Sequence, residues 1–257
     1  MSADVLGEIL ADVRQRVENG QYALPEKAAA PGPDGGRFVA SLRESGVRII
    51  AEIKQRSPSA GEILPGADGK VESLALAYRR GHAAAISVVT DEKFFGGNPA
   101  WIPRARRISG LPVLMKDFIV SERQLDLAAA LGADAVLLIV RALKAEELAA
   151  LAEGARKRRL ATVVEAHGAE EIPRAAQVRP DVLGVNARDL SSFETDLTAL
   201  EKLAAAIPQG PVRLAESGIR SREDVRRLAN AGFEAFLVGE ALLRSEDPEE
   251  MMRELKS

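Results

Sequence analysis

The chain has 257 residues, of which 46% are hydrophobic and 28% are charged, so it can build a large core and still keep a polar surface. Its formal net charge of −3 provides no overall attraction to nucleic acid or to an acidic membrane, which favours a small ligand held by a local site. The absence of cysteine excludes disulfides, thiolate metal sites and a cysteine nucleophile. The two histidines, His82 and His167, are too few for most histidine-based metal centres, so we expect no metal.

No N-terminal segment has the pattern of a signal peptide, and no apolar run approaches the roughly 20 residues that span a bilayer. We therefore expect a cytoplasmic protein with no membrane partner.

The N-terminal part is predicted to be an extension, residues 1–46, attached to the main fold. Apolar residues at helical spacing predict an amphipathic helix over 2–19. The proline- and glycine-rich stretch 25–36 predicts a linker or surface loop, with ordered structure resuming near Arg37.

From Val47 onward, short apolar runs alternate with helical patterns, as in a parallel sheet whose strands are buried on both faces. The predicted strands are 47–53, 85–89, 112–116, 135–140, 162–165, 182–186, 212–216 and 235–239. The predicted helices that follow them are 71–80, 98–109, 121–131, 144–158, 168–178, 197–206, 221–231 and 247–255.

Eight consecutive strand–helix units without a hairpin favour closure into a (βα)8 barrel over residues 47–257. The main rival is a doubly wound open sheet, which more often has five to seven strands. We therefore predict an α/β protein of 1–257 as one domain, a TIM barrel with an additional N-terminal helix.

Polar residues interrupt the ends of five predicted strands, where barrel active sites form. A single charge at a strand end is usually the first solvated residue of a loop, but five such ends are harder to explain in that way. Clustered lysines and glutamates shift one another's pKa values and suit general acid–base chemistry. The polar residues at the five strand ends are Glu52 and Lys54, Lys116, Glu165, Asn186 with Arg188, and Glu216 with Ser217.

The loops after the last two strands predict a phosphate site. They contain Gly218, followed by Ile219 and Arg220, and Gly239, followed by Glu240. Glycines there permit close backbone approach, and a helix start supplies free N–H groups. The alternative is that these glycines only turn the chain.

Other positions have weaker signals. The segment 55–61, which includes Ser57, is predicted to be either a lid over an anionic substrate or a plain surface turn. Phe94, Phe95 and Phe118 follow strands, as core plugs or as a platform for a planar ring. We expect His82 on the surface and Trp101 in a helix against the barrel. For His167, which follows Glu165, the alternatives are a side chain that reaches the barrel mouth and a position at a helix start, of which the helix start is favoured.

Several motifs, in order from about residue 47 to 245, closely resemble those of indole-3-glycerol-phosphate synthase, and the N-terminal helix resembles the extra helix of that family. The motifs are Ala51-Glu52-Ile53-Lys54 with Ser57-Pro58-Ser59, Thr90-Asp91-Glu92-Lys93-Phe94-Phe95-Gly96-Gly97, Leu114-Met115-Lys116-Asp117-Phe118, Val164-Glu165, Gly184-Val185-Asn186-Ala187-Arg188-Asp189-Leu190 and Ala215-Glu216-Ser217-Gly218-Ile219.

The resemblance implies closure of an indole ring from 1-(2-carboxyphenylamino)-1-deoxyribulose 5-phosphate, with loss of carbon dioxide and water and without cofactor or metal. It implies that Lys116 is the general acid and that Glu165 accepts a proton in dehydration or rearomatisation. It also implies that Lys54 pairs with the substrate carboxylate and is a candidate proton donor in dehydration, and that Glu52 orients the lysines and binds a substrate hydroxyl. The remaining implied contacts are a positioning set (Asn186, Arg188, Glu216, Ser217), an aromatic pair around the anthranilate ring (Phe95, Phe118) and backbone donors to phosphate (Gly218, Gly239, Glu240). Other tryptophan-pathway enzymes are implied as candidate partners.

Two departures from the family pattern are mild. Many relatives carry lysine where this chain has Ala60, and residues 61–70 match the family pattern poorly. These differences bear on the affinity for substrate and on the behaviour of the loop as a lid. Glu240 stands where some relatives have a serine or another small residue after the glycine. This difference weakens a side-chain contact to phosphate but not a backbone contact.

Two other functions compete with this one. Another phosphate-binding barrel, such as an isomerase of phosphoribosyl anthranilate, would use a carboxylate with a cysteine or aspartate. A binding or regulatory barrel subunit would not need Lys116 and Glu165 together.

Overall fold

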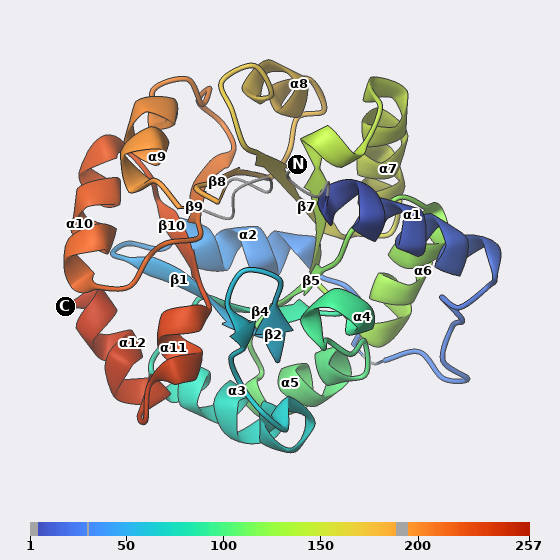
Figure 1. Ribbon diagram of the computed structural model, residues 1–257, viewed down its shortest axis with the longest axis horizontal. Coiled ribbons are helices and arrows are strands. Elements are labelled where there is room, and N and C mark those ends of the chain that lie inside the picture. The colour runs from blue at the N-terminus through green and yellow to red at the C-terminus, as the bar shows by residue number, and fades with distance from the viewer. Residues whose placement is uncertain (1–4, 30, 189–194) are drawn as a thin grey trace.

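The computed structural model describes residues 5–29, 31–188 and 195–257. Eight parallel strands close into a barrel in the order β1-β10-β9-β8-β7-β6-β5-β4, which confirms the predicted TIM barrel (Figure 1). The barrel strands are β1 (Arg48–Ile53), β4 (Ala85–Val89), β5 (Val113–Lys116), β6 (Ala135–Ile139), β7 (Ala161–Ala166), β8 (Val182–Asn186), β9 (Val212–Glu216) and β10 (Ala235–Val238). The short strands β2 (Arg56–Ser57) and β3 (Gly61–Glu62) pair separately as an antiparallel hairpin in the loop after β1.

Helices surround the barrel, and each predicted helix is present with adjusted ends (Figure 1). They are α1 (Val5–Glu18), α2 (Gly35–Arg43), α3 (Val71–Arg80), α4 (Glu92–Phe95), α5 (Trp101–Ser109), α6 (Glu122–Leu131), α7 (Ala145–Lys157), α8 (Ile172–Gln177), α9 (Leu197–Ala204), α10 (Arg222–Ala231), α11 (Glu240–Arg244) and α12 (Pro248–Lys256), with short 3-10 turns η1 (Ala67–Lys70) and η2 (Val140–Ala142). None of the helices in the described part of the chain is long and apolar enough to cross a membrane.

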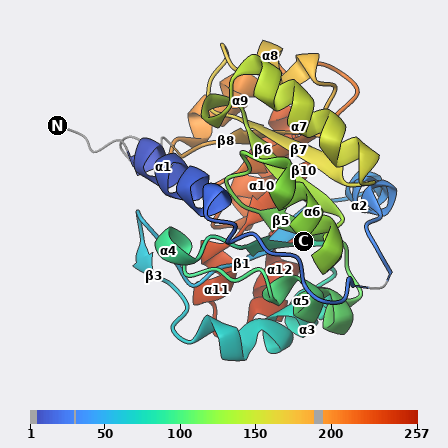
Figure 2. The same ribbon diagram turned by 90° about the vertical axis from the view of Figure 1, so that its right-hand side faces the viewer.

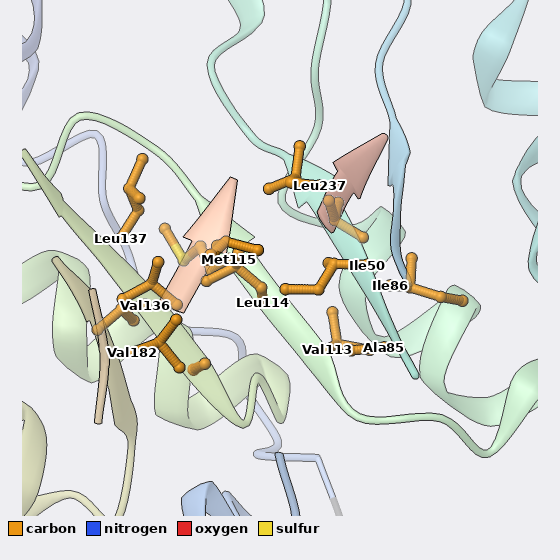
Figure 3. Packing of buried hydrophobic residues seen from close by; sticks show 14 of the residues in the cluster. Ile50, Ala85, Ile86, Val113, Leu114, Met115, Val136, Leu137, Val182 and Leu237 are labelled. Atoms are coloured by element: carbon orange, nitrogen blue, oxygen red, sulfur yellow. The ribbon is translucent and has the colours of Figure 1, made fainter. Parts of the chain in front are cut away.

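The barrel core is made of branched aliphatic side chains that alternate along each strand. Figure 3 shows buried apolar side chains of the barrel strands packed together, among them Ile50 and Leu114, which are fully buried. This packed layer closes the interior beneath the carboxyl ends of the strands, so the polar residues at those ends lie on a rigid floor.

Helix α2 was not predicted, because its first two residues, Gly35 and Gly36, belong to the proline- and glycine-rich stretch 25–36 that indicates a loop. Asp34 caps it by accepting the N–H of Arg37, and Phe38 and Leu42 bury its apolar face. The helix contacts the beginnings of β1 and β7, so it closes the amino end of the barrel. Figure 2 shows α2 at one end of the barrel, and α1, α4 and β3 at the other.

Gly35 is required for this closure, because a Cβ there would lie 2.5 Å from the backbone nitrogen of Ala161. We expect Gly35→Ala to lower the free energy of unfolding by about 1–3 kcal/mol, since backbone must move to relieve the overlap. Gly36→Ala is the matched control, because its Cβ meets only the Asp34 carboxylate at 3.5 Å. Urea unfolding of both variants tests this, and equal stability would contradict it.

Helix α1 is tied to the loop that follows β4. Arg16 pairs with Asp91 at 2.5 Å, and Lys93 pairs with Asp12 at 2.6 Å. The helix of the predicted extension therefore lies beside the carboxyl end of the barrel, with its first described residue at Val5. Residues 2–4 of the predicted helix lie outside the described residues.

Candidate active site

A cavity of about 1080 Å³, including the space open to solvent, lies at the carboxyl ends of the barrel strands. Every site residue predicted from the sequence lines it. These are Glu52, Lys54, Ser57, Phe95, Lys116, Phe118, Glu165, Asn186, Arg188, Glu216, Ser217, Gly218, Gly239 and Glu240. The sequence therefore located the cavity correctly, whereas the roles of these residues stay predictions.

The four buried charged groups of the cavity come from alternate strands around the barrel. Glu52 is on β1, Lys116 on β5, Glu165 on β7 and Glu216 on β9. Inward-pointing residues of alternate strands form one layer in a barrel of this kind, so the four side chains converge. Here the layer above the apolar floor consists of three carboxyl groups and one ammonium.

Lys116 is the cation of this layer. Its Nζ lies 3.4 Å from Oε2 of Glu165 and 3.5 Å from Oε2 of Glu216. Burial alone would lower the pKa of Lys116, but Glu165, Glu216 and Glu52 outweigh burial and raise it above its usual value. Lys116 is therefore protonated at neutral pH and carries a proton that it can deliver inside the cavity.

Glu165 and Glu216 have opposite protonation tendencies, although both are buried. Burial would raise the pKa of Glu165, but Lys116 and His167 lower it, with help from hydrogen bonds to Glu216 and Asn186. Burial and the charge of Glu165 raise the pKa of Glu216 well above its ordinary value. Glu216 therefore holds the proton of the pair and donates it toward Glu165, which remains a carboxylate.

Glu52 pairs with Lys54 on its own strand, with 2.6 Å between Oε1 and Nζ. Burial would raise the pKa of Glu52, but Lys54 and Lys116 lower it, so it is ionised. Its second oxygen, Oε2, is buried and has no hydrogen-bond partner among the described residues. This oxygen is free to accept a hydrogen bond from a ligand.

Two glycines make room for these carboxyl groups. A Cβ at Gly239 would lie 2.7 Å from Oε1 of Glu52, and a Cβ at Gly184 would lie 2.2 Å from Oε1 of Glu216. A side chain at either position would displace a carboxyl group of the layer, so both positions require glycine for steric reasons.

Phe95 and Phe118 form the aromatic part of the cavity. Their ring centroids are 5.8 Å apart and their planes are tilted by 35°. Both line the cavity, whereas Phe94 does not and carries the Lys93 ammonium over its ring at 5.2 Å. All three rings are partly buried and pack against the core, and a platform for a planar ring stays a prediction for Phe95 and Phe118.

The loop after β1 folds over one side of the opening as the β2–β3 hairpin. Arg188 donates a hydrogen bond to Ser59, which joins this hairpin to the loop after β8. Ser57 accepts the N–H of Ala60 at 3.1 Å and lies 3.2 Å from the Ser59 hydroxyl. The segment predicted as a lid or a turn is thus an ordered hairpin at the rim. Asp189 and Leu190, at the end of the matched motif, lie outside the described residues.

The loops after β9 and β10 form the side of the cavity predicted to bind phosphate. Ser217 and Gly218 both have positive φ, of 68° and 77°, which turns the chain sharply after β9. Gly239 precedes α11, and the Glu240 side chain pairs with Arg244 at 3.0 Å along that helix. Arg220, which follows Gly218 and Ile219 in the same loop, also lines the cavity, although only the loop is predicted from the sequence.

Asp117 lines the cavity, and no role is predicted for it from the sequence. It is buried, accepts the Thr90 hydroxyl at 2.8 Å and accepts the N–H of Phe118 at 2.8 Å. Burial, with a contribution from Asp91, raises the pKa of Asp117 to about 6. Its position in the motif, directly after Lys116, was the available signal.

The two histidines and the tryptophan occupy different environments. His82 is exposed and Trp101 begins α5 with its ring buried, both as predicted. His167 does not begin a helix, because α8 starts only at Ile172, so that prediction is wrong. Its side chain is instead buried beside Glu165.

No group of three His, Asp or Glu side chains suited to a metal ion occurs in residues 5–29, 31–188 and 195–257. The cavity is lined by ammonium, guanidinium, carboxyl and hydroxyl groups.

Comparison with solved structures supports the fold. Thiamine phosphate pyrophosphorylase from Pyrococcus furiosus has a TM-score of 0.58 and 19% sequence identity, covering 85% of this chain and 95% of that chain. At this identity the likeness shows the shared barrel alone.

Comparison of sequences identifies the family. A family model described as indole-3-glycerol phosphate synthase matches residues 6–255. Indole-3-glycerol phosphate synthase 2 of Streptomyces coelicolor is 45% identical over 235 residues, covering 91% of this chain and 90% of that protein. Indole-3-glycerol phosphate synthase of Geobacillus thermodenitrificans is 42% identical over 248 residues, covering 95% and 94%. Since the match spans nearly the whole of each chain, this protein belongs to the indole-3-glycerol phosphate synthase family.

Proposed function

We propose that this chain converts 1-(2-carboxyphenylamino)-1-deoxyribulose 5-phosphate into indole-3-glycerol phosphate, carbon dioxide and water. The observation that carries the proposal is Lys116, a buried ammonium held between Glu165 and Glu216 in the cavity. Such a group delivers a proton to a ketone oxygen, while the neighbouring carboxylate is placed to accept one.

In the first step, the aromatic carbon that carries the substrate carboxylate attacks the ketone carbon. The carbonyl π electrons move to oxygen, which takes the proton of Lys116 and becomes a hydroxyl. Loss of carbon dioxide from the attacking carbon then returns its bonding pair to the benzene ring. Phe95 and Phe118 flank that ring, and Lys54 pairs with the carboxylate before it leaves.

In the second step, the new hydroxyl leaves as water. Lys54 supplies the proton for this departure, and Glu165 removes a proton from the substrate, so that the carbon–carbon double bond of the five-membered ring forms. Oε2 of Glu52, which has no hydrogen-bond partner among the described residues, accepts a hydrogen bond from a substrate hydroxyl. Backbone N–H groups near Gly218 and Gly239 bind the phosphate, and Arg188 and Arg220 add positive charge at the rim.

The competing functions fit this layer less well. An isomerase of the phosphoribosyl anthranilate type would pair a carboxylate with a cysteine or an aspartate, and it has no need of the two inward lysines, Lys54 and Lys116, that line this cavity. A binding subunit gains nothing from burying an ammonium among three carboxyl groups, since burying charges costs free energy.

The direct experiment mixes purified protein with the carboxyphenylamino deoxyribulose phosphate and records indole fluorescence and released carbon dioxide. We expect equimolar amounts of both products. Binding of the substrate without either product would support the binding subunit and contradict the proposal.

A further inference from the structure

His167 lies behind Glu165, outside the cavity. The residue directly follows β7 and stands two positions after Glu165. The His167 side chain is only 2% exposed and does not line the cavity. It therefore reaches the reacting groups only through Glu165.

The imidazole lies between two carboxylates. Nε2 is 3.3 Å from Oε1 of Glu165, and Nδ1 is 3.7 Å from Oε2 of Glu171. Both ring nitrogens are buried, and neither makes a hydrogen bond of good geometry in the described part of the chain, so the two carboxylates are the nearest acceptors that a small rotation of the ring would bring into line. The Glu165 carboxylate is thus held on both oxygens, with His167 at Oε1 and Lys116 at Oε2.

Glu171 is itself fixed on the far side of the imidazole. Its Oε1 accepts a hydrogen bond from Nε of Arg141 at 2.9 Å, and its Oε2 accepts the backbone N–H of His167 at 2.9 Å. Burial would raise the pKa of Glu171, but His167 and Arg141 lower it to about 2. A permanent carboxylate therefore stands next to Nδ1 of the imidazole.

The turn between β7 and α8 does not explain the imidazole. Glu171 closes this turn through the backbone N–H of His167, and nearly any residue provides that group. A buried imidazole with two carboxylates, one of them in the catalytic layer, calls for a role of its side chain.

We propose that His167 is a positioning residue, which donates Nε2–H to Oε1 of Glu165, holds that carboxylate in its reactive orientation and keeps it ionised. Glu171 orients the ring by attracting Nδ1, and Arg141 fixes Glu171. A hydrogen bond to an ionised acceptor favours the charged form, so His167 lowers the pH at which Glu165 becomes a working base. The other charged and polar groups that face Glu165 are Lys116, Glu216, Asn186 and, across the same layer, Glu52.

This inference rests on the proposed role of Glu165 as a base. The test compares pH profiles of kcat and KM for the wild-type protein and for His167→Leu, His167→Gln, Glu171→Gln and Glu165→Gln. His82→Gln is the matched control, since it changes the exposed histidine.

For His167→Leu we expect kcat to fall about tenfold, the effect of losing one hydrogen bond to a charged group, while KM stays within about twofold. The acid limb of the kcat profile should move to higher pH by at least about half a unit, because Glu165 loses a donor that stabilises its carboxylate. His167→Gln retains an N–H at a similar reach and should keep kcat within about threefold of wild type. Glu171→Gln should move the acid limb in the same direction by less.

A fall in kcat with no movement of the acid limb, or equal losses in the Leu and Gln variants, would overturn the role of His167. If His167→Leu does not fold, Glu171→Gln decides, and an unmoved acid limb in that variant overturns the role of His167. Failure of the proposed base is recognised separately, because Glu165→Gln would then keep most of its activity and its acid limb.

Discussion

Lys116→Ala should reduce kcat by a factor on the order of 10²–10⁴, the usual contribution of a positioned general acid. Without the ammonium, no positively charged proton donor of the layer remains next to the substrate ketone, and Glu165 and Glu216 lose their shared cation. Steady-state indole fluorescence measures the loss. Because the substrate is also bound through its ring, carboxylate and phosphate, KM should change much less than kcat.

Lys157→Ala is the matched control for this variant, since Lys157 is an exposed lysine at the end of α7. It should leave kcat unchanged. Circular dichroism checks that Lys116→Ala keeps its fold. A folded Lys116→Ala protein that retains more than about a few per cent of wild-type kcat would contradict the acid role, since the smallest expected loss is about a hundredfold.

Glu165→Gln should also lower kcat by a factor on the order of 10²–10⁴, because an amide cannot accept the proton released in dehydration. Lys116 keeps Glu216 and Glu52 as neighbours in this variant, so it remains a cation and ring closure proceeds. The effect on kcat should therefore come from the second half of the reaction.

The pH dependence follows from the lowered pKa of Glu165. The wild-type base is available at neutral pH, and activity is lost as the pH falls through that pKa. Glu165→Gln should abolish this acid limb. Glu170→Gln, in the exposed turn after the same strand, is the matched control and should retain both kcat and the limb.

The barrel could be predicted because the hydrophobic pattern of the sequence marks its strands clearly. β4, β8 and β9 have the predicted ends, since each is a continuous apolar run bounded by turn residues. Helix α2 could not be predicted, because its helical signal is short and its stability comes from the barrel end that it covers. The helix after β7 was predicted four residues too early, because residues 168–171 are helical in composition but Glu171 turns back to bind the N–H of His167.

The members of the site were predictable, but their partners were not. Period-2 alternation placed Glu52 and Lys54 on one face, and the structure pairs them. Which carboxyl groups surround Lys116 depends on how the strands are ordered around the barrel, and their opposite protonation depends on burial together with mutual repulsion. His167 was assigned to a helix start because sequence spacing says nothing about the carboxylates on either side of its ring.

The central claim is that Lys116 and Glu165 act at different steps, ring closure and dehydration. A single turnover of Glu165→Gln, with carbon dioxide and indole fluorescence recorded together, tests it most directly. The account predicts that close to one equivalent of carbon dioxide is released well before the indole signal appears, whereas Lys116→Ala releases neither. Carbon dioxide and indole that appear together at the same slowed rate in Glu165→Gln would contradict it, because Glu165 would then act at or before ring closure.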